Sequence, residues 1–404
     1  MAQSIISRRG SQYVKINYDY YYKVNPISHC QVKYSPWGTT TSAGASIANK
    51  KYAIFAGGNA GSGTINNTIG FSENLSTVGV STLSIARNWC YGIDIGSYGL
   101  ICGGTTNGGP TGAVDTVDTY NSSLIKGSTT LYSAAQAPMT AKAGTEYALV
   151  AGGIKTNDSY VTSVTAFSSS LSKTSVSSLS QGRYNRQGGV GIGNYAIFVG
   201  GMYASGSYSN KIDVYNSSLT KISTSITLST PRFYFGSAGI GNYAIFAGGS
   251  ISDSAKTSTV ETVSVNLVRS SLTNLPNASW QITGGKVGNY AIFAGGSTSS
   301  VYLSGVYAYT PSLVRTTIDS LLVARECCAC ANVGDYILFS SGNAGSPVDC
   351  TDAYSSNSEF YLSITKGSKY KFNNSNAELS ANSSTTLTFT EPVTGYVKMK
   401  KGTI

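Results

Sequence analysis

The residue types that most often carry out catalysis are scarce in this chain. Its 404 residues include one histidine, His29, seven irregularly placed cysteines and 18 acidic side chains. A single histidine excludes multi-histidine metal sites and most histidine-dependent triads. No glycine-rich loop is followed by Lys and then Ser or Thr, as phosphate-binding loops require. The sequence therefore predicts a protein that is not an enzyme and that needs no cofactor and no metal.

The side chains best suited to recognition recur at one position of a repeat. Arginine and aromatic residues precede a short glycine-rich segment, and further tyrosines lie in nearby loops. Rigid aromatic groups among Ser, Asn and Gly give contact area at low entropy cost. We therefore predict ligand contacts, to a sugar or a protein, at Arg87, Trp89, Arg183, Tyr184, Tyr203, Tyr208, Arg232, Tyr234, Trp280, Tyr302 and Arg325.

Two other groups of candidate residues point to structure. The thiol cluster Cys327-Cys328-Ala329-Cys330 has no second Cys or His pair at zinc spacing, which favours small buried residues. Asp118 and Asp213 occupy equivalent positions of the repeat, with Asp352 near the corresponding place in the last copy. Because they recur with the repeat, we expect these carboxylates to support the fold.

The repeat itself is an apolar run that ends in Gly-Gly, such as Tyr195 to Gly201. Seven copies end at glycines 58, 104, 153, 201, 249, 296 and 342, in steps of 46 to 49 residues. So regular a period predicts one supersecondary unit stacked repeatedly. The run suits a buried strand, which follows a short strand of small residues through a hairpin such as Gly193-Asn194.

Two more strands complete the unit. An alternating strand such as Ile212 to Tyr215 is followed by a turn and by a Ser/Thr-rich strand such as Ile222 to Leu228. Four antiparallel strands in about 48 residues are typical of one blade of a β-propeller. The sequence therefore predicts an all-β, seven-bladed propeller over residues 42–365, with small β attachment segments at residues 1–41 and 366–404.

The run into Gly-Gly, the aromatic third strand and the arginine that opens several repeats resemble the kelch repeat. The chain departs from that pattern because it lacks the tryptophan that kelch blades usually carry in the fourth strand. The resemblance implies a second role for Arg87, Arg183, Arg232 and Arg325, which is to join neighbouring blades. Closure of the ring has two candidates, an N-terminal outer strand over residues 29–34 and a C-terminal one from Glu359 to Thr365.

Charge is sparse and lies at the two ends. Only 11% of residues are charged, and the net charge is +10. Residues 1–40 hold five basic and one acidic side chain, and residues 361–404 hold six basic and two acidic ones. Because the repeat region is nearly neutral, it is not expected to bind nucleic acid. No signal peptide or membrane-spanning segment is expected either.

The low-charge composition, rich in Ser, Thr, Gly, Tyr and Asn, resembles bacteriophage tail-fibre or receptor-binding proteins. That resemblance implies a virion component that binds a host-surface glycan or protein, joins other virion or tail proteins through its basic ends, and forms a homo-oligomer in the assembly. The alternatives are a virion decoration protein without receptor binding and an intracellular kelch-type interaction adaptor.

Overall fold

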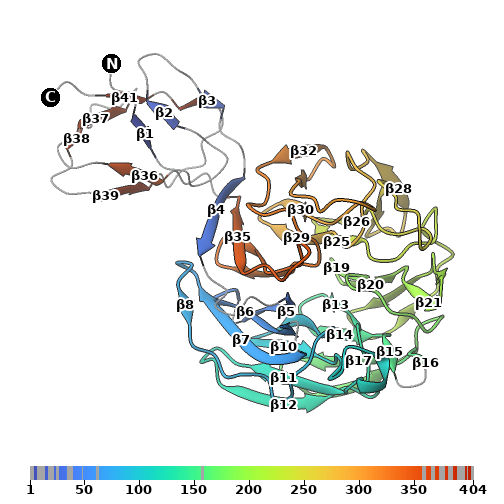
Figure 1. Cartoon of the computed structure of the whole chain (residues 1–404). Helices are drawn as coiled ribbons and strands as arrows, with labels where there is room; N and C mark the ends of the chain where they lie inside the picture. The colour runs from blue at the N-terminus through green and yellow to red at the C-terminus, as the bar shows by residue number, and fades with distance from the viewer. Residues whose placement is uncertain are drawn as a thin grey trace.

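Seven four-stranded antiparallel sheets surround a common axis and form a β-propeller (Figure 1). The computed structural model describes residues 27–33 and 40–356, apart from residues 48, 61–62 and 156–158, together with short strands nearer both ends. Six of the sheets are each one copy of the sequence repeat, the seventh adds an N-terminal strand to its copy, and the first strand of every copy lies at the axis. The predicted all-β, seven-bladed fold is therefore confirmed.

In the first three blades, the strands follow one another from the axis outward in chain order. Blade one contains β5 (Thr40–Ile47), β6 (Tyr52–Asn59), β7 (Thr64–Ser72) and β8 (Thr77–Val78). Blade two contains β9 (Tyr91–Ile95), β10 (Tyr98–Cys102), β11 (Thr116–Tyr120) and β12 (Lys126–Thr130). Blade three contains β13 (Met139–Ala143), β14 (Tyr147–Ala151), β17 (Val164–Ser168) and β18 (Lys173–Val176).

The next three blades repeat the same order. Blade four contains β19 (Gly189–Ile192), β20 (Tyr195–Val199), β23 (Ile212–Asn216) and β24 (Lys221–Ile222). Blade five contains β25 (Gly236–Ile240), β26 (Tyr243–Ala247), β27 (Val260–Ser264) and β28 (Arg269–Leu272). Blade six contains β29 (Thr283–Val287), β30 (Tyr290–Ala294), β31 (Val306–Tyr309) and β32 (Arg315–Ile318). The outer strand predicted from Ile222 to Leu228 is wrong in its extent, since β24 ends at Ile222.

Blade seven takes its outer strand from the other end of the chain. It contains β33 (Ala329–Val333), β34 (Tyr336–Ser340), β35 (Cys350–Ser355) and β4 (Ser28–Lys33). β4 pairs with β35 over its whole length, and the His29 ring stacks on Tyr354 with a centroid distance of 4.5 Å. Of the two candidates for closure, the N-terminal one is confirmed, because β36 (Tyr361–Ile364) pairs with β39 (Thr385–Thr388) instead.

The remaining elements are short. Two ribbons lie in the loops after the second strands of blades three and four: β15 (Ile154–Lys155) with β16 (Ser159–Tyr160), and β21 (Met202–Ala204) with β22 (Ser207–Tyr208). A 3-10 turn covers Pro110–Gly112. Nearer the ends, β1 (Ser4–Ile6) pairs with β2 (Val14–Ile16), β3 (Tyr22–Lys23) with β40 (Tyr396–Val397), and β37 (Lys369–Phe372) with β38 (Glu378–Ser380) and β41 (Met399–Lys401).

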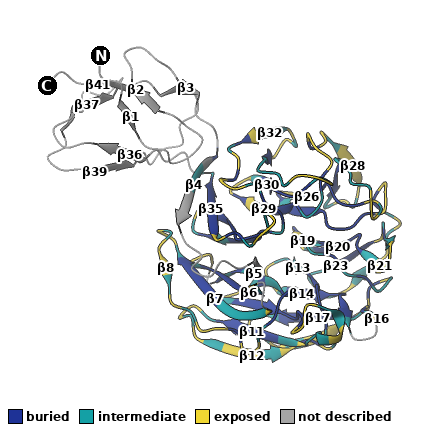
Figure 2. Ribbon diagram, viewed as in Figure 1, coloured by how far each residue is buried: buried dark blue, intermediate teal, exposed yellow. Residues whose placement is uncertain are grey.

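The second strand of each blade forms the core between neighbouring sheets. In β20 all four residues after Tyr195 are buried, and β26 and β30 share this pattern (Figure 2). Because successive side chains of a strand point to opposite faces, each such strand supplies both of the interfaces that its blade makes. A continuous apolar run is what two buried faces require, and this explains the repeated Tyr-Ala-Ile-Phe sequence.

The Gly-Gly pair is needed because the backbone of neighbouring loops passes very close to the end of the second strand. In blade four, Gly200 and Gly201 have φ angles of 56° and 105°. The N–H of Gly201 donates to the Arg232 carbonyl at 2.9 Å. A Cβ on Gly200 would lie 2.7 Å from that same carbonyl oxygen, and one on Gly201 would lie 2.5 Å from the Tyr184 carbonyl oxygen. Neither the backbone conformation nor the space accepts a side chain.

The innermost strands meet in a closed ring of small residues, here called the axial ring: Gly44, Gly92, Thr140, Gly189, Ser237, Gly284 and Cys330. The ring closes between blades seven and one, where a Cβ on Gly44 would collide with the Cys330 carbonyl. Where a larger residue occurs, its side chain bonds to the preceding blade. The Thr140 and Ser237 hydroxyls donate to the carbonyls of Gly92 and Gly189, both at 3.1 Å.

Candidate binding surface and axial cavity

The four predicted arginine contacts lie in the interior. The side chains of Arg87, Arg183, Arg232 and Arg325 are at most 1% exposed. Each forms an ion pair of 2.7–2.8 Å with a carboxylate of its own blade, namely Asp118, Asp213, Glu261 and Asp352. Their backbone carbonyls accept the N–H of the second glycine of the preceding blade. The arginine side chains thus stabilise the interior of their own blades, whereas the link to the preceding blade is made by the backbone, as it also is at Ala135 and Ser279. A surface ligand would not contact these side chains in this structure.

In blades two to seven, the arginine and its acidic partner are either both present or both absent. Blade three has Ala135 and Thr165 at the equivalent positions, and blade six has Ser279 and Tyr307. A buried charge is tolerated when it is paired, so a blade that lacks the arginine also lacks the acid. The structural role predicted for Asp118, Asp213 and Asp352 is confirmed by these ion pairs.

The pKa values of two of these carboxyl groups are lowered. Burial acts to raise the pKa of Asp213, but the Arg183 charge and the hydrogen bonds from Lys221, Arg183 and Ser180 outweigh it. Burial likewise acts to raise the pKa of Asp352, and hydrogen bonding by His29 together with the Arg325 charge reverses the effect. Both groups are therefore held as carboxylates in the folded protein.

Five of the predicted aromatic residues come together on the face from which the innermost strands start. With two neighbours they form a connected cluster, here called the aromatic face: Trp89, Tyr160, Tyr184, Tyr208, Phe233, Tyr234 and Trp280. Ring centroids lie 5.0 Å apart for Tyr184 and Phe233, 5.6 Å for Tyr234 and Trp280, and 6.1 Å for Trp89 and Tyr234. Tyr234 and Phe233 are buried, whereas the other five are half-buried.

Polar groups surround these rings. The Tyr208 hydroxyl donates to Asp253 at 2.8 Å, and Trp280 Nε1 donates to the Ser297 hydroxyl at 2.7 Å. Lys256 Nζ lies 5.1 Å from the centre of the Trp280 ring. The surface thus offers apolar ring faces with a carboxylate, an ammonium and hydroxyls beside them, a combination suited to recognition of a partly polar ligand.

The other predicted contacts lie outside this cluster. Tyr203 is 37% exposed, and Tyr302 is half-buried with its hydroxyl 3.4 Å from Asn343 Nδ2. The prediction omitted Tyr160 and Phe233. Tyr160 reaches the cluster only because the β15–β16 ribbon carries it beside Tyr184, with centroids 6.1 Å apart. No spacing rule in the sequence would have indicated that approach.

Beneath the aromatic face, Arg186 closes one end of the propeller axis. Its Nε donates to the Tyr91 hydroxyl at 3.0 Å, and its NH1 donates to Gln281 Oε1 at 2.9 Å and contacts Cys327 Sγ. The guanidinium also lies 4.9 Å from the centre of the Trp89 ring. The cavity among these side chains has a volume of only about 20 Å³. Arg186 was not predicted from the sequence, because its partners come from three other blades.

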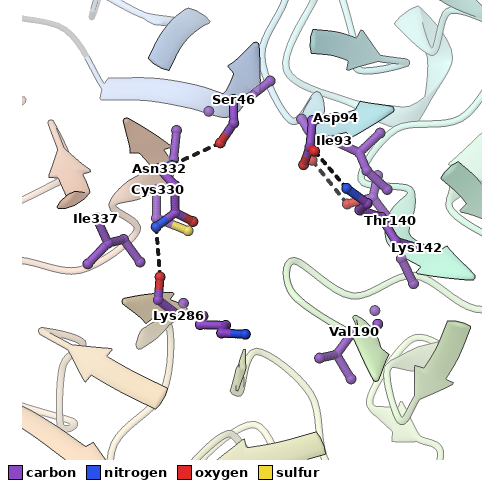
Figure 3. Close-up of a pocket in the computed structure, with 18 of the residues that line it drawn as sticks. Ser46, Ile93, Asp94, Thr140, Lys142, Val190, Lys286, Cys330, Asn332 and Ile337 are labelled. Carbon is purple, nitrogen blue, oxygen red and sulfur yellow. Dashed lines mark hydrogen bonds and ion pairs between the residues drawn. The ribbon is translucent and has the colours of Figure 1, made fainter. Parts of the chain in front are cut away.

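At the other end the axis opens into a cavity of about 440 Å³, here called the outer cavity (Figure 3). A narrower space of about 150 Å³ joins it to the region of Arg186, and the two share axial-ring residues such as Gly44 and Gly92. The outer cavity carries one ion pair, between Lys142 Nζ and Asp94 at 2.7 Å. Within the described part of the chain, no three His, Cys, Asp or Glu side chains are grouped as metal ligands would be.

The protein is a seven-bladed β-propeller. This fold is compatible with a binding or protein-interaction role. The solved structure of YjhT matches this chain with a TM-score of 0.50 and 12% sequence identity, covering 83% of this chain and 97% of that chain. At this identity the likeness shows the fold alone. No family model and no curated protein matches the sequence. None of the described residues forms a helix long and apolar enough to cross a membrane.

Proposed function

We propose that the protein is a non-enzymatic binding protein whose aromatic face takes up a glycan or a protein segment on a host-cell surface. The observation that supports this most directly is the gathering of half-buried aromatic rings from blades two to six on one face. Each ring is already held by its neighbours, so little side-chain entropy is lost when a ligand binds.

A glycan is the ligand that best fits the chemistry of this surface. The C–H face of a sugar ring packs on an aromatic plane, while its hydroxyls need donors and acceptors at the edge of that plane. Trp280 offers such a plane, with Lys256 over it and the hydroxyl of Ser297 at its indole nitrogen. Asp253, bonded to Tyr208, supplies an acceptor at the other side of the cluster.

The proposed setting is a bacteriophage virion, in a tail-fibre or receptor-binding role. It is supported by the composition, with 11% charged residues and abundant Ser, Thr, Gly, Tyr and Asn. The basic segments at both ends are the proposed attachment sites for other virion proteins and for further copies of the chain. The kelch-like features of the repeat belong to the same proposal and do not by themselves indicate a ligand.

The test compares purified protein with a variant carrying Tyr184→Ala and Trp280→Ala, in binding to whole bacterial cells and to immobilised cell-wall glycans. Both side chains are half-buried and lie outside the arginine ion pairs, so the variant is expected to fold. Removal of two central aromatic contacts is expected to weaken binding at least about tenfold.

Tyr132→Ala is the matched control, because Tyr132 is 49% exposed and is not part of the aromatic face. It should bind like the unaltered protein. Equal binding by the double variant would refute the role of the aromatic face. Binding to other virion proteins but to no cell surface would instead make the chain a decoration or structural component.

A further inference from the structure

We propose that the outer cavity is a second binding site, on the face opposite the aromatic face, and that it takes a small oxyanion such as a carboxylate or phosphate. Around its opening lie the residues two positions beyond the axial ring, here called the mouth ring: Ser46, Asp94, Lys142, Gly191, Gly239, Lys286 and Asn332. All of these except Gly239 line the cavity. The proposal does not depend on the function assigned to the aromatic face.

The charge of the mouth ring favours an anion. The one carboxylate, Asp94, is already paired with Lys142. Lys286 is exposed, and no described acidic side chain pairs with it. In Figure 3 its side chain runs along the edge of the cavity, on the side between Asn332 and Val190. One unpaired ammonium in a concave wall, with the ion pair opposite, leaves the site with a net positive charge, which raises the local concentration of anions.

The backbone adds hydrogen-bond donors. Each innermost strand is the edge of its sheet, so alternate N–H and C=O groups point away from the partner strand. Asn332 shows this direction, because its N–H donates to the Ser46 hydroxyl of the next blade at 3.0 Å. Gly191 holds the same register position in β19 as Asn332 does in β33, so its N–H likewise points toward the next blade, where Gly239 carries no side chain that could accept it.

The acceptors that would oppose an anion are largely occupied. The carbonyl of Lys286 accepts the Asn332 side-chain amide at 2.7 Å. The carbonyl of Lys142 is covered by the close approach of β19, since a Cβ on Gly191 would lie 2.6 Å from its oxygen. The wall therefore presents the Lys286 ammonium, the Ser46 hydroxyl and the Gly191 N–H as its available donors, a set suited to an oxyanion.

The cavity is blind, and this limits what can enter it. Arg186 and its partners close the axis beyond the axial ring, so a ligand arrives only from the face of the first hairpins. A volume of about 440 Å³ accommodates a free metabolite-sized anion or the acidic side chain of a protein partner. Both sources present the same chemistry to Lys286.

Titration calorimetry at low ionic strength tests the site with three probes: citrate, inorganic phosphate and a hexa-glutamate peptide. Lys286→Gln is expected to weaken binding of the accepted probe at least about tenfold, the effect of losing one charge-assisted hydrogen bond. Because Lys286 is exposed, its replacement is not expected to alter folding, which thermal unfolding checks. Lys50→Gln is the matched control, since Lys50 is exposed on the same face but does not line the cavity.

Binding of citrate or phosphate alone, with loss in the Lys286 variant, supports a site for free anions. Binding of the peptide with the same dependence supports a protein-borne carboxylate. The proposal is overturned if the unaltered protein binds none of the probes at about 10 mM, where even a millimolar site is filled. It is also overturned if Lys286→Gln and Lys50→Gln bind equally well.

Discussion

Replacement of Asp213 by Thr should destabilise the propeller strongly, because it leaves the buried Arg183 charge without a counter-ion. Arg183 is 0% exposed and lies 2.8 Å from the carboxylate. Breaking a buried ion pair by removing one partner costs about 3–5 kcal/mol of the free energy of unfolding. The Asp94–Lys142 pair offers a control. Both side chains are more than a third exposed, so Asp94→Ala should cost less than about 1 kcal/mol.

Blade three shows how the loss of Asp213 can be compensated. The double variant Arg183→Ala and Asp213→Thr copies its Ala135 and Thr165 and leaves no fully buried charge behind, because Lys221, the second partner of Asp213, is 27% exposed. The two single changes should therefore together cost about 1–3 kcal/mol more than the double variant. Urea unfolding followed by tryptophan fluorescence measures all four proteins. Additivity within about 0.5 kcal/mol would show that Arg183 and Asp213 are not energetically coupled and would refute the reasoning.

Three further outcomes are expected. Gly200→Ala should lower the free energy of unfolding by about 1–3 kcal/mol in urea, since φ is 56° there, whereas Gly79→Ala, with open space around the position, should have little effect. The lowered pKa of Asp213 means that its pair contributes fully above the ordinary value of 3.8 and loses its contribution as the pH falls through the folded value. Below about pH 4, the thermal midpoint followed by circular dichroism should therefore fall more steeply for the unaltered protein than for the double variant. Deletion of residues 1–33 removes β4 and should produce aggregates on size-exclusion chromatography by exposing the edge of β35, whereas deletion of residues 1–26 should not.

The blades could be predicted from the sequence because each blade repeats the same local sequence pattern. Seven Gly-Gly markers and the hairpin residues before each tyrosine fix the order of the strands. Ring closure could not be decided in the same way. Residues 29–34 and 359–365 have similar strand character, and the choice depends on pairing with β35, which lies more than 300 residues from β4. Such pairing leaves no local signature.

The site was predicted less completely than the fold. An arginine that opens a repeat suggests a surface contact when it is considered alone. Its acidic partner lies about 30 residues later, as Asp213 does for Arg183, and the two together indicate a buried ion pair. The joint absence of both residues from blades three and six is visible in the sequence and indicates the buried pair. Arg186 is different, because its position at the axis depends on contacts with Tyr91, Gln281 and Cys327 from three other blades.

The pairing of β4 with β35 also determines how mechanical load passes through the molecule. Ser28, where β4 begins, lies opposite Ser355, where β35 ends. Both chain segments therefore join the propeller at one point of blade seven. A force that pulls the two segments apart would open the β4–β35 ladder one hydrogen bond at a time from that point, leaving the other six blades without tension. A force that pulls both segments in the same direction would load the propeller at that single attachment point in blade seven.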